Sequence, residues 1–165
     1  MQTFVPYPDM KRSAQVLDSR RLGKQRVEVL QIVRALTWPT YAWKNHPAVL
    51  MWRGHEAALG LYAAAVCQEW IARGYNDTCD LKIRTDLADA GFIDIPATQE
   101  EAALPSWWGD DAVHRSHRSS LLRKDPEHYR LLFEPDLPDD LEYVWPVQVE
   151  KKPRTKAGRK PTGTG

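Results

Sequence analysis

Helical spacing of apolar residues is the feature of this sequence that most limits its fold. A helix is predicted from Ser13, a suitable N-cap, to about Leu36. Within it, Leu22, Val29 and Val33 fall on one arc of a helical wheel. The sequence has no set of segments in which apolar and polar residues alternate, as the strands of a half-buried sheet would need. It therefore predicts an all-α protein.

Caps and helix breakers predict four more helices. The longest begins at Asn45 and Pro47 and ends at Arg73-Gly74, where glycine supplies the left-handed residue of a C-cap. The other three are expected over residues 86–90, 111–123 and 126–132. The proline-containing segment that follows, residues 134–149, predicts extended chain along the surface.

The chain is expected to form one domain and one tail. Its 165 residues suit a single compact helical domain over residues 1–150, and hydrophobic residues make up 42% of the sequence. Residues 151–165 are rich in Lys, Pro, Gly and Thr, which predicts a disordered basic tail. Cys67 and Cys79 lack C-x-x-C spacing and are interpreted as ordinary thiols. Without a signal-peptide pattern or a membrane-length apolar run, a cytoplasmic protein is expected.

Charge is distributed unevenly along a chain whose formal net charge is +1. Residues 1–60 carry nine Lys/Arg against four Asp/Glu, and residues 131–150 carry six acids and no base. Residues 151–165 carry six bases and no acid. Such segregation lets a near-neutral protein present one strongly positive face. On charge alone, a solvated mosaic of both signs is an equally good interpretation.

The predicted first helix carries charged residues on both of its faces. A helical wheel puts Arg21, Lys24 and Glu28 on one face and Arg26 among the apolar residues of the other. Because an arginine in an apolar arc needs a partner, Asp18 on the same arc is predicted to pair with Arg26. Lys24 and Glu28 have the i,i+4 spacing of an ordinary helix ion pair, so their spacing alone does not make them a site.

Three sequence blocks follow one another along the chain. They are Leu-Gly-Lys-Gln-Arg-Val-Glu at 22–28, Asn-His-Pro-Ala-Val at 45–49 with Arg-Gly-Tyr at 73–75, and the His-, Ser- and Arg-rich run at 114–129. Each is similar to a block of the pyrimidine-dimer DNA glycosylase family, whose phage member is endonuclease V. Because the blocks occur in the family's order and cover most of residues 1–133, the resemblance is fairly specific.

The resemblance implies a single all-α domain whose amino terminus lies against the first helix. It also implies a DNA repair glycosylase with AP lyase activity, in which the free α-amine forms a Schiff base with the damaged nucleotide. An α-amine has an unperturbed pKa of about 8, so part of it is neutral at pH 7, whereas a lysine at about 10.4 needs a large shift. A nearby carboxylate moves protons and stabilises positive charge, and the reaction requires no metal or cofactor.

Transferred onto this chain, the catalytic roles fall on Met1 and Glu28. Gln2 is expected to hinder removal of the initiator methionine, so Met1 itself is predicted to supply the amine, with Lys24 as the second candidate. Glu28 is the predicted carboxylate because it completes the Gln-Arg-x-Glu that follows the matched Leu-Gly. It stands one residue further from the preceding arginine than the phage member's carboxylate does, so Asp18 is the alternative.

DNA contacts are predicted in the first and third blocks and at His46. Arginines on the first helix of this family hold phosphates or the flipped nucleotide, and the matching residues here are Arg20, Arg21, Lys24 and Arg26. Five bases against two acids in residues 114–130 predict a second row of phosphate contacts, which includes Arg115, Arg118 and Lys124. His46 either orients DNA or occupies the first turn of its helix. Trp107-Trp108 either stack against bases or pack in the core.

The expected partner is double-stranded damaged DNA, bound by a nucleoid-associated monomer. His114 and His117 have i,i+3 spacing, but no third ligand follows from spacing and no metal site is predicted. Phosphate-loop, nucleophile-elbow and dinucleotide motifs are absent from the sequence. Two other functions stay open: a non-catalytic DNA-binding protein on the same scaffold, and a glycosylase for a different modified base.

Overall fold

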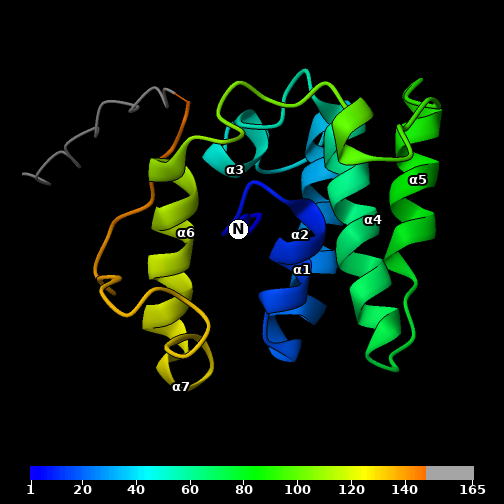
Figure 1. Cartoon of the computed structure of the whole chain (residues 1–165). Helices are drawn as coiled ribbons and strands as arrows, with labels where there is room; N and C mark the ends of the chain where they lie inside the picture. Colours follow the sequence, from blue (N-terminus) through cyan, green and yellow to red (C-terminus); the bar gives the residue numbers. More distant parts are fainter. Residues whose placement is uncertain (148–165) are drawn as a thin grey trace, which may run out of the picture.

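Helices form the regular structure of residues 1–147, the part of the chain that this computed structural model describes (Figure 1). In chain order they are α1 (Met10–Val16), α2 (Ser19–Thr37), α3 (Pro47–Leu50), α4 (Glu56–Ala72), α5 (Cys79–Asp89), the 3-10 helix η1 (Gln99–Glu101), α6 (Asp111–Lys124) and α7 (Pro126–Tyr129). Residues 1–147 contain no β-strand, so the predicted all-α class is confirmed. The predicted basic tail, residues 151–165, lies outside the described residues.

The predicted first helix is two helices, each capped by an aspartate. Asp9 caps α1 and Asp18 caps α2, each by accepting a hydrogen bond from a backbone N–H three residues later. Leu17 and Asp18 between them have extended backbone. The prediction of one helix from a Ser13 cap to Leu36 was therefore wrong at its start. Ser13 is buried inside α1, where its hydroxyl donates to the Tyr7 carbonyl at 3.0 Å.

The predicted second helix is likewise two helices. His46 caps α3, because its Nδ1 accepts a hydrogen bond from the Ala48 N–H at 3.0 Å. Turns occupy residues 51–54, where Gly54 has a φ of 83°, before α4 begins. The predicted stop is confirmed, since α4 ends at Ala72 and Gly74 has a φ of 93°.

The remaining helices match the predictions with shifted ends. α5 begins well before residue 86, because the Asp77 carboxylate accepts hydrogen bonds from the N–H groups of Cys79 and Asp80. α6 runs over nearly the predicted range with Asp110 as its N-cap, while α7 stops at Tyr129, short of the predicted 132. Residues 134–147 contain neither helix nor strand, as predicted for that part of the segment. No described helix is long and apolar enough to cross a membrane.

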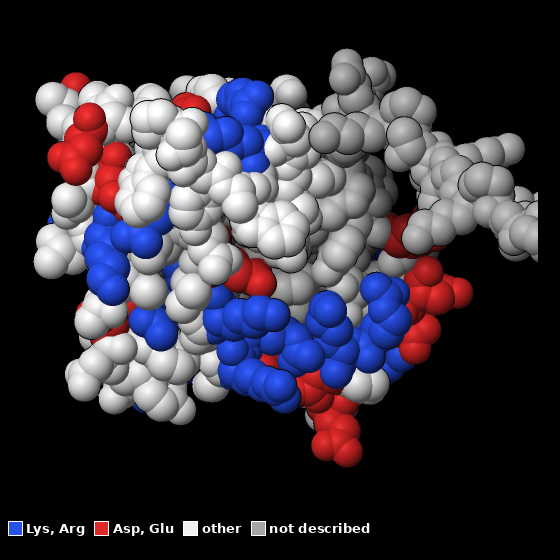
Figure 2. Space-filling view, turned by 180° about the vertical axis from the view of Figure 1, so that it is seen from behind, with Lys and Arg blue, Asp and Glu red and all other residues white. Residues whose placement is uncertain are grey.

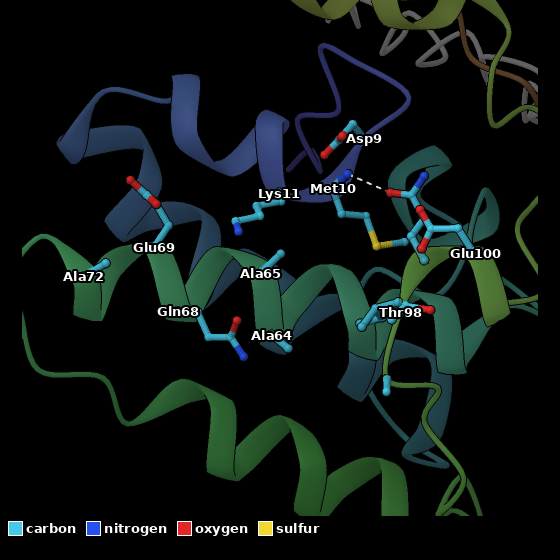
Figure 3. Close-up of a pocket in the computed structure, with 13 residues that line it drawn as sticks. Asp9, Met10, Lys11, Ala64, Ala65, Gln68, Glu69, Ala72, Thr98 and Glu100 are labelled. Carbon is cyan, nitrogen blue, oxygen red and sulfur yellow. Dashed lines mark hydrogen bonds between the residues drawn. The ribbon is translucent and has the colours of Figure 1, made fainter.

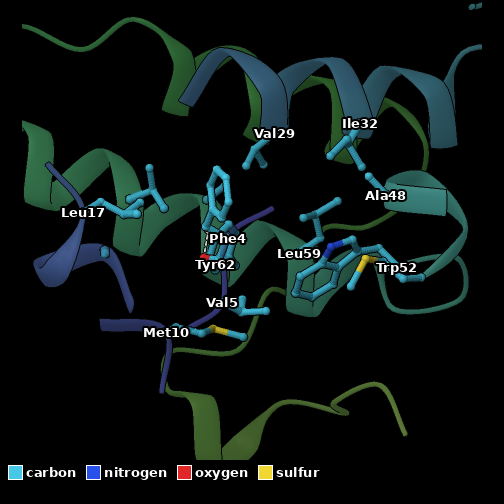
Figure 4. Close-up of a cluster of buried hydrophobic side chains, with 14 of the residues drawn as sticks. Phe4, Val5, Met10, Leu17, Val29, Ile32, Ala48, Trp52, Leu59 and Tyr62 are labelled. Carbon is cyan, nitrogen blue, oxygen red and sulfur yellow. Dashed lines mark hydrogen bonds between the residues drawn. The ribbon is translucent and has the colours of Figure 1, made fainter. Parts of the chain in front are cut away.

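The core lies between α2, α4 and α5, which pack on one another in pairs, with α1 against α4 (Figure 1). Val29 from α2 and Leu59 and Tyr62 from α4 are fully buried there. The amino-terminal segment joins this core, and Figure 4 shows Phe4 and Val5 among the helix side chains. Residues 2–6 are buried although they belong to no helix. Their backbone polar groups must therefore find partners within the protein.

Side chains of α2, of α4 and of the turn between α3 and α4 hold this segment through hydrogen bonds. The Gln25 carboxamide accepts from the Phe4 N–H and donates to the Gln2 carbonyl, both at 2.8 Å. The Tyr62 hydroxyl donates to the Phe4 carbonyl at 2.6 Å, and the Trp52 indole donates to the Thr3 hydroxyl at 2.9 Å. The expected position of the amino terminus against the first long helix is confirmed.

Side chains of α6 hold the next two residues. His114 Nδ1 donates to the Val5 carbonyl at 2.7 Å, while His117 Nδ1 accepts from the Val5 N–H at 3.0 Å. Arg118 donates to the Pro6 carbonyl at 2.7 Å. Each histidine thus has a set tautomer, and the chain start is held from two sides, by α2 and α4 on one and by α6 on the other.

Acid is expected to destabilise the fold through these histidines. Burial lowers the pKa of His117 to about 3, and burial also lowers the pKa of His114 despite its bond to the Val5 carbonyl. In the unfolded chain histidine titrates near about 6.5, so below that pH the unfolded state binds protons that the folded state does not. The free energy of unfolding should therefore fall as pH drops from about 6.5 toward 3, by about 1.4 kcal/mol per pH unit from His117 and by more with His114.

Urea denaturation at several pH values between 6.5 and 4.5 measures this slope. The window stays above the titration of the aspartates Asp18 and Asp77, whose lowered pKa values matter only near and below pH 4. A free energy of unfolding that is constant across the window would contradict the prediction.

Candidate active site

A cavity of about 490 Å³ opens beside the chain start. The amino-terminal segment contributes Met1, Gln2 and Phe4 to its lining. The other lining residues come from α2, from the end of α6 and from the carboxy-terminal segment: Arg20, Arg21, Lys24, Glu28, Lys124 and Tyr143. We call this space the Met1 cavity. It brings together both predicted catalytic residues and four of the eight predicted DNA contacts.

The Met1 cavity is cationic around a single carboxylate. Arg20, Arg21, Lys24 and Lys124 line it, and within residues 1–147 Glu28 is the one acidic residue of the lining. Figure 2 shows Lys and Arg side chains gathered in a band across the lower part of one face of the molecule. Several positive charges on one surface attract an anionic polymer.

Glu28 is held in place by α2. Its carboxylate lies 3.6 Å from the Lys24 ammonium, and its side chain is only 14% exposed against 74% for Lys24. The predicted i,i+4 pair is therefore present. Because Lys24 is so exposed, the pair adds little stability. The exposed Lys24 side chain can contact a ligand, while the Glu28 side chain is largely shielded from solvent.

The charges of the amino terminus and of Glu28 both affect the pKa of His46. Burial lowers the pKa of His46, and the positive charge of the amino-terminal nitrogen lowers it further, while the Glu28 carboxylate acts in the opposite direction. These effects require both charges to lie near the imidazole. The net result favours the neutral ring, which suits its role as the N-cap of α3. His46 therefore lies at the start of its helix as the N-cap, directly before the first turn in which one of the two interpretations placed it.

Asp18, the alternative carboxylate, lies outside the Met1 cavity lining. Its carboxylate accepts a hydrogen bond from the Tyr129 hydroxyl at 2.6 Å, and it pairs with Arg21 at 3.2 Å. Burial raises the pKa of Asp18, but the hydrogen bonds from Tyr129 and Arg21 outweigh burial and hold it below the usual value. Asp18 therefore joins α2 to α7, and its carboxylate already accepts three hydrogen bonds.

The predicted pair between Asp18 and Arg26 was wrong. Arg26 pairs with Asp77, which precedes α5, and its guanidinium lies 4.4 Å from the centre of the Trp70 ring. An arginine in the apolar arc did need a carboxylate, as the sequence indicated, but the carboxylate comes from 51 residues away. Arg26 consequently faces α4 and α5 rather than the Met1 cavity.

Of the predicted second row of contacts, Lys124 alone lines the Met1 cavity. Arg118 is 8% exposed, and besides the Pro6 carbonyl it contacts Glu134 at 3.2 Å. It therefore supports the chain start. Arg115 is half-buried on α6 and does not line the cavity.

Trp107 and Trp108 pack in the core, the second of the two interpretations. Trp107 is 5% exposed, donates to the Met51 carbonyl at 2.8 Å and packs edge-on against Trp52. His114 and His117 are occupied with Val5, as described above. Among residues 1–147 no group of three or more His, Cys, Asp or Glu is arranged to hold a metal ion.

Two contributors to this site escaped the sequence analysis. Gln25 is 1% exposed, and a polar residue three positions after Leu22 and four before Val29, inside the apolar arc, was a usable signal. Tyr143 reaches the cavity from a segment far along the chain, and no local pattern indicated it.

A second cavity of about 490 Å³ has the opposite chemistry (Figure 3). It lies between the start of α1, the α4 residues with small side chains and the segment at 97–100. Three carboxylates, Asp9, Glu69 and Glu100, line it against one lysine, Lys11. Such a lining repels phosphate, and it contains none of the predicted site residues. Of the two cavities, the Met1 cavity is the one suited to an anionic substrate.

Comparison with known proteins found one match. Residues 1–83 match the family model described as pyrimidine dimer DNA glycosylase. The matched half of the chain includes Met1, all of α2 and therefore Glu28. Searches of curated proteins and of solved structures found no match.

Proposed function

The chain belongs to the pyrimidine dimer DNA glycosylase family, and we propose that it removes damaged pyrimidines and then cuts the strand through an imine formed by the Met1 α-amine. Membership supports a DNA substrate and a glycosylase. The observation that supports the mechanism is the Met1 cavity, where the first residue and the Glu28 carboxylate line the same space as two arginines and two lysines.

In the proposed first step the neutral Met1 nitrogen forms a bond to C1′ of the damaged nucleotide. The C1′–N bond to the pyrimidine breaks, and the base leaves with the electron pair and takes up a proton. The amine then loses a proton, the C1′–O4′ bond breaks and O4′ takes up a proton, which opens the sugar ring and leaves a protonated imine. Glu28 stabilises the positive charge that develops and transfers these protons, since a partly buried carboxylate is less screened by water than an exposed one.

In the proposed second step the imine acidifies the C2′ proton. Removal of that proton breaks the C3′–O bond, so the strand is cut by β-elimination, and water then releases the sugar fragment from Met1. Every atom in this sequence comes from DNA, water or the protein. Glu28 is the carboxylate that lines the cavity together with the amine, so it is the proposed acid–base group.

Arg20, Arg21, Lys24 and Lys124 are proposed to bind the phosphates on either side of the lesion. These residues carry the positive charge of the cavity, and phosphate contacts orient a duplex without reading its sequence. Selectivity then follows from the lesion, because a distorted nucleotide leaves the helical stack at a lower cost than a normal one.

Borohydride trapping tests the proposal directly. The protein is incubated with three duplexes, carrying a cyclobutane dimer, an abasic site or no damage, and the imine is reduced in place. We expect a covalent protein–DNA adduct on the first two and none on the third, with the sugar fragment mapped by mass spectrometry to the Met1 peptide. Absence of an adduct on both damaged duplexes would overturn the mechanism.

The remaining outcomes identify the alternatives. An adduct with abasic DNA but none with the dimer indicates a glycosylase for a different modified base. Salt-sensitive binding without any adduct indicates a DNA-binding protein that uses this scaffold without the chemistry.

A further inference from the structure

Trp43 has an unfavourable backbone conformation and little burial to offset it. Its φ is 72°, and among residues 1–147 it is the sole non-glycine residue with a positive φ. A bulky residue adopts this region only where its surroundings impose it, and such strain is concentrated at functional sites. Its side chain is nevertheless 60% exposed. A tryptophan at this position therefore contributes little to the stability of the fold. Its exposed ring is instead available to contact a ligand.

A row of aromatic rings connects Trp43 with the Met1 cavity. Trp43 packs against His46 and His46 against Trp145, with ring centres 6.0 Å apart in both pairs. Trp145 packs against Tyr143 at 5.4 Å, and Tyr143 lines the cavity. The row therefore runs from an exposed indole to the space beside the amine, and it joins the loop before α3 to the carboxy-terminal segment.

Geometry and charge indicate what this row binds. Tyr143, at one end of the row, lines the cavity whose cations are proposed to bind DNA phosphates. A ligand that extends from this cavity to Trp43 at the other end would therefore be part of the same DNA. An exposed indole offers a flat apolar face, which stacks on any nucleobase whatever its sequence. The four exposed or half-exposed cations beside the row favour DNA over a protein as its ligand, because they attract phosphates.

We propose that Trp43 stacks on a base of the duplex that leaves the helical stack when the damaged nucleotide enters the Met1 cavity. The inference rests on the proposed function for its substrate, but it concerns binding and not the covalent step. Trp43 thereby takes the stacking role that the sequence suggested for Trp107-Trp108.

Binding measurements on Trp43→Gly and Trp43→Phe test the proposal. A duplex with a reduced abasic analogue, which cannot form an imine, is compared with the same duplex undamaged. We expect Trp43→Gly to bind the damaged duplex about 5- to 150-fold more weakly, the usual contribution of one base-stacking side chain, with a much smaller loss on the undamaged duplex. Trp43→Phe should retain most of the affinity, because it keeps an aromatic face.

Thermal unfolding separates stacking from a structural role. Glycine adopts a positive φ without strain, so Trp43→Gly should unfold at the same or a higher temperature than the parent protein. Trp38→Ala is the matched control, since Trp38 is also an exposed indole, 39% exposed, but packs against Tyr41 outside the aromatic row. This variant should bind both duplexes as the parent protein does.

A fluorescent base gives the direct readout. With 2-aminopurine opposite the abasic analogue, stacking on an indole quenches emission, so the parent complex should be dimmer than the Trp43→Gly complex. Equal emission, or equal losses of affinity on damaged and undamaged duplexes, would overturn the proposal. Because the analogue forms no adduct, failure of the imine mechanism leaves this result unaffected, and the two proposals fail independently.

Discussion

A protein extended by one residue before Met1 should form no borohydride-trapped adduct and should lose strand cleavage on the order of 10³-fold or more. Extension converts the Met1 amine into a peptide nitrogen, whose lone pair is delocalised and is not nucleophilic. The new amine lies about 3.5 Å further along the chain. It cannot take the old position, because hydrogen bonds to Gln25, Trp52 and Tyr62 hold residues 2–4 in the core.

A removable extension provides the control. An amino-terminal tag is joined through a protease site that leaves no extra residue, and activity is measured before and after cleavage on one preparation. Cleavage should restore both the adduct and the strand break, while intact mass confirms that Met1 is present. DNA binding should change little, because the arginine and lysine side chains of α2 are untouched.

If the extended protein still formed the adduct, the nucleophile would be a group other than the Met1 amine. Lys24 is then the first candidate, since its ammonium lies 3.6 Å from Glu28 in the same cavity. Loss of the adduct in the extended Lys24→Met protein, and not in Lys24→Met alone, would establish that second assignment.

Glu28→Gln should reduce single-turnover cleavage of dimer-containing DNA by roughly 10²–10⁴-fold, the usual contribution of a positioned acid–base group. Glutamine keeps the shape of the side chain but can neither take up a proton nor carry the negative charge that stabilises a cationic imine. The melting temperature should barely change, because the ion pair with the 74% exposed Lys24 contributes little. Affinity for DNA should stay equal or rise, since a negative charge leaves a phosphate-binding surface.

Glu69→Gln is the matched control on α4. Glu69 also pairs with a base four residues away, Arg73 at 3.0 Å, and its side chain is 23% exposed against 14% for Glu28. It lines the acidic cavity rather than the Met1 cavity. Its cleavage rate should match that of the parent protein. Equal rates in Glu28→Gln and Glu69→Gln would remove Glu28 from the proposed mechanism.

Local interactions were predictable from the sequence. The all-α class, the stop of α4 at Ala72 and the extent of α6 follow from spacing and caps within a few residues of one another. The same holds for the Lys24–Glu28 pair, because one turn of helix fixes which side chains meet. Such contacts require no knowledge of how the rest of the chain folds.

Contacts between distant residues were not predictable in this way. Asp18 interrupts the first helix with support from Tyr129, and Arg26 takes Asp77 in place of Asp18. The sequence indicated that each of these charged side chains needs a partner of opposite charge or a hydrogen bond. Several residues of the chain could have served equally well as that partner. The choice depended on which segments pack together.

For the candidate site, the sequence by itself determined the helix that carries Glu28. The family resemblance of the sequence also identified Met1 as the candidate nucleophile. Tertiary structure alone decided that Met1, Glu28, Lys124 and Tyr143 share one cavity, and that Trp43 lies exposed at the end of an aromatic row leading to it. The physical reason is that helix caps and i,i+4 pairs act over a single turn. Burial of the chain start between α2 and α6 depends instead on hydrogen bonds that close loops of 21 to 112 residues.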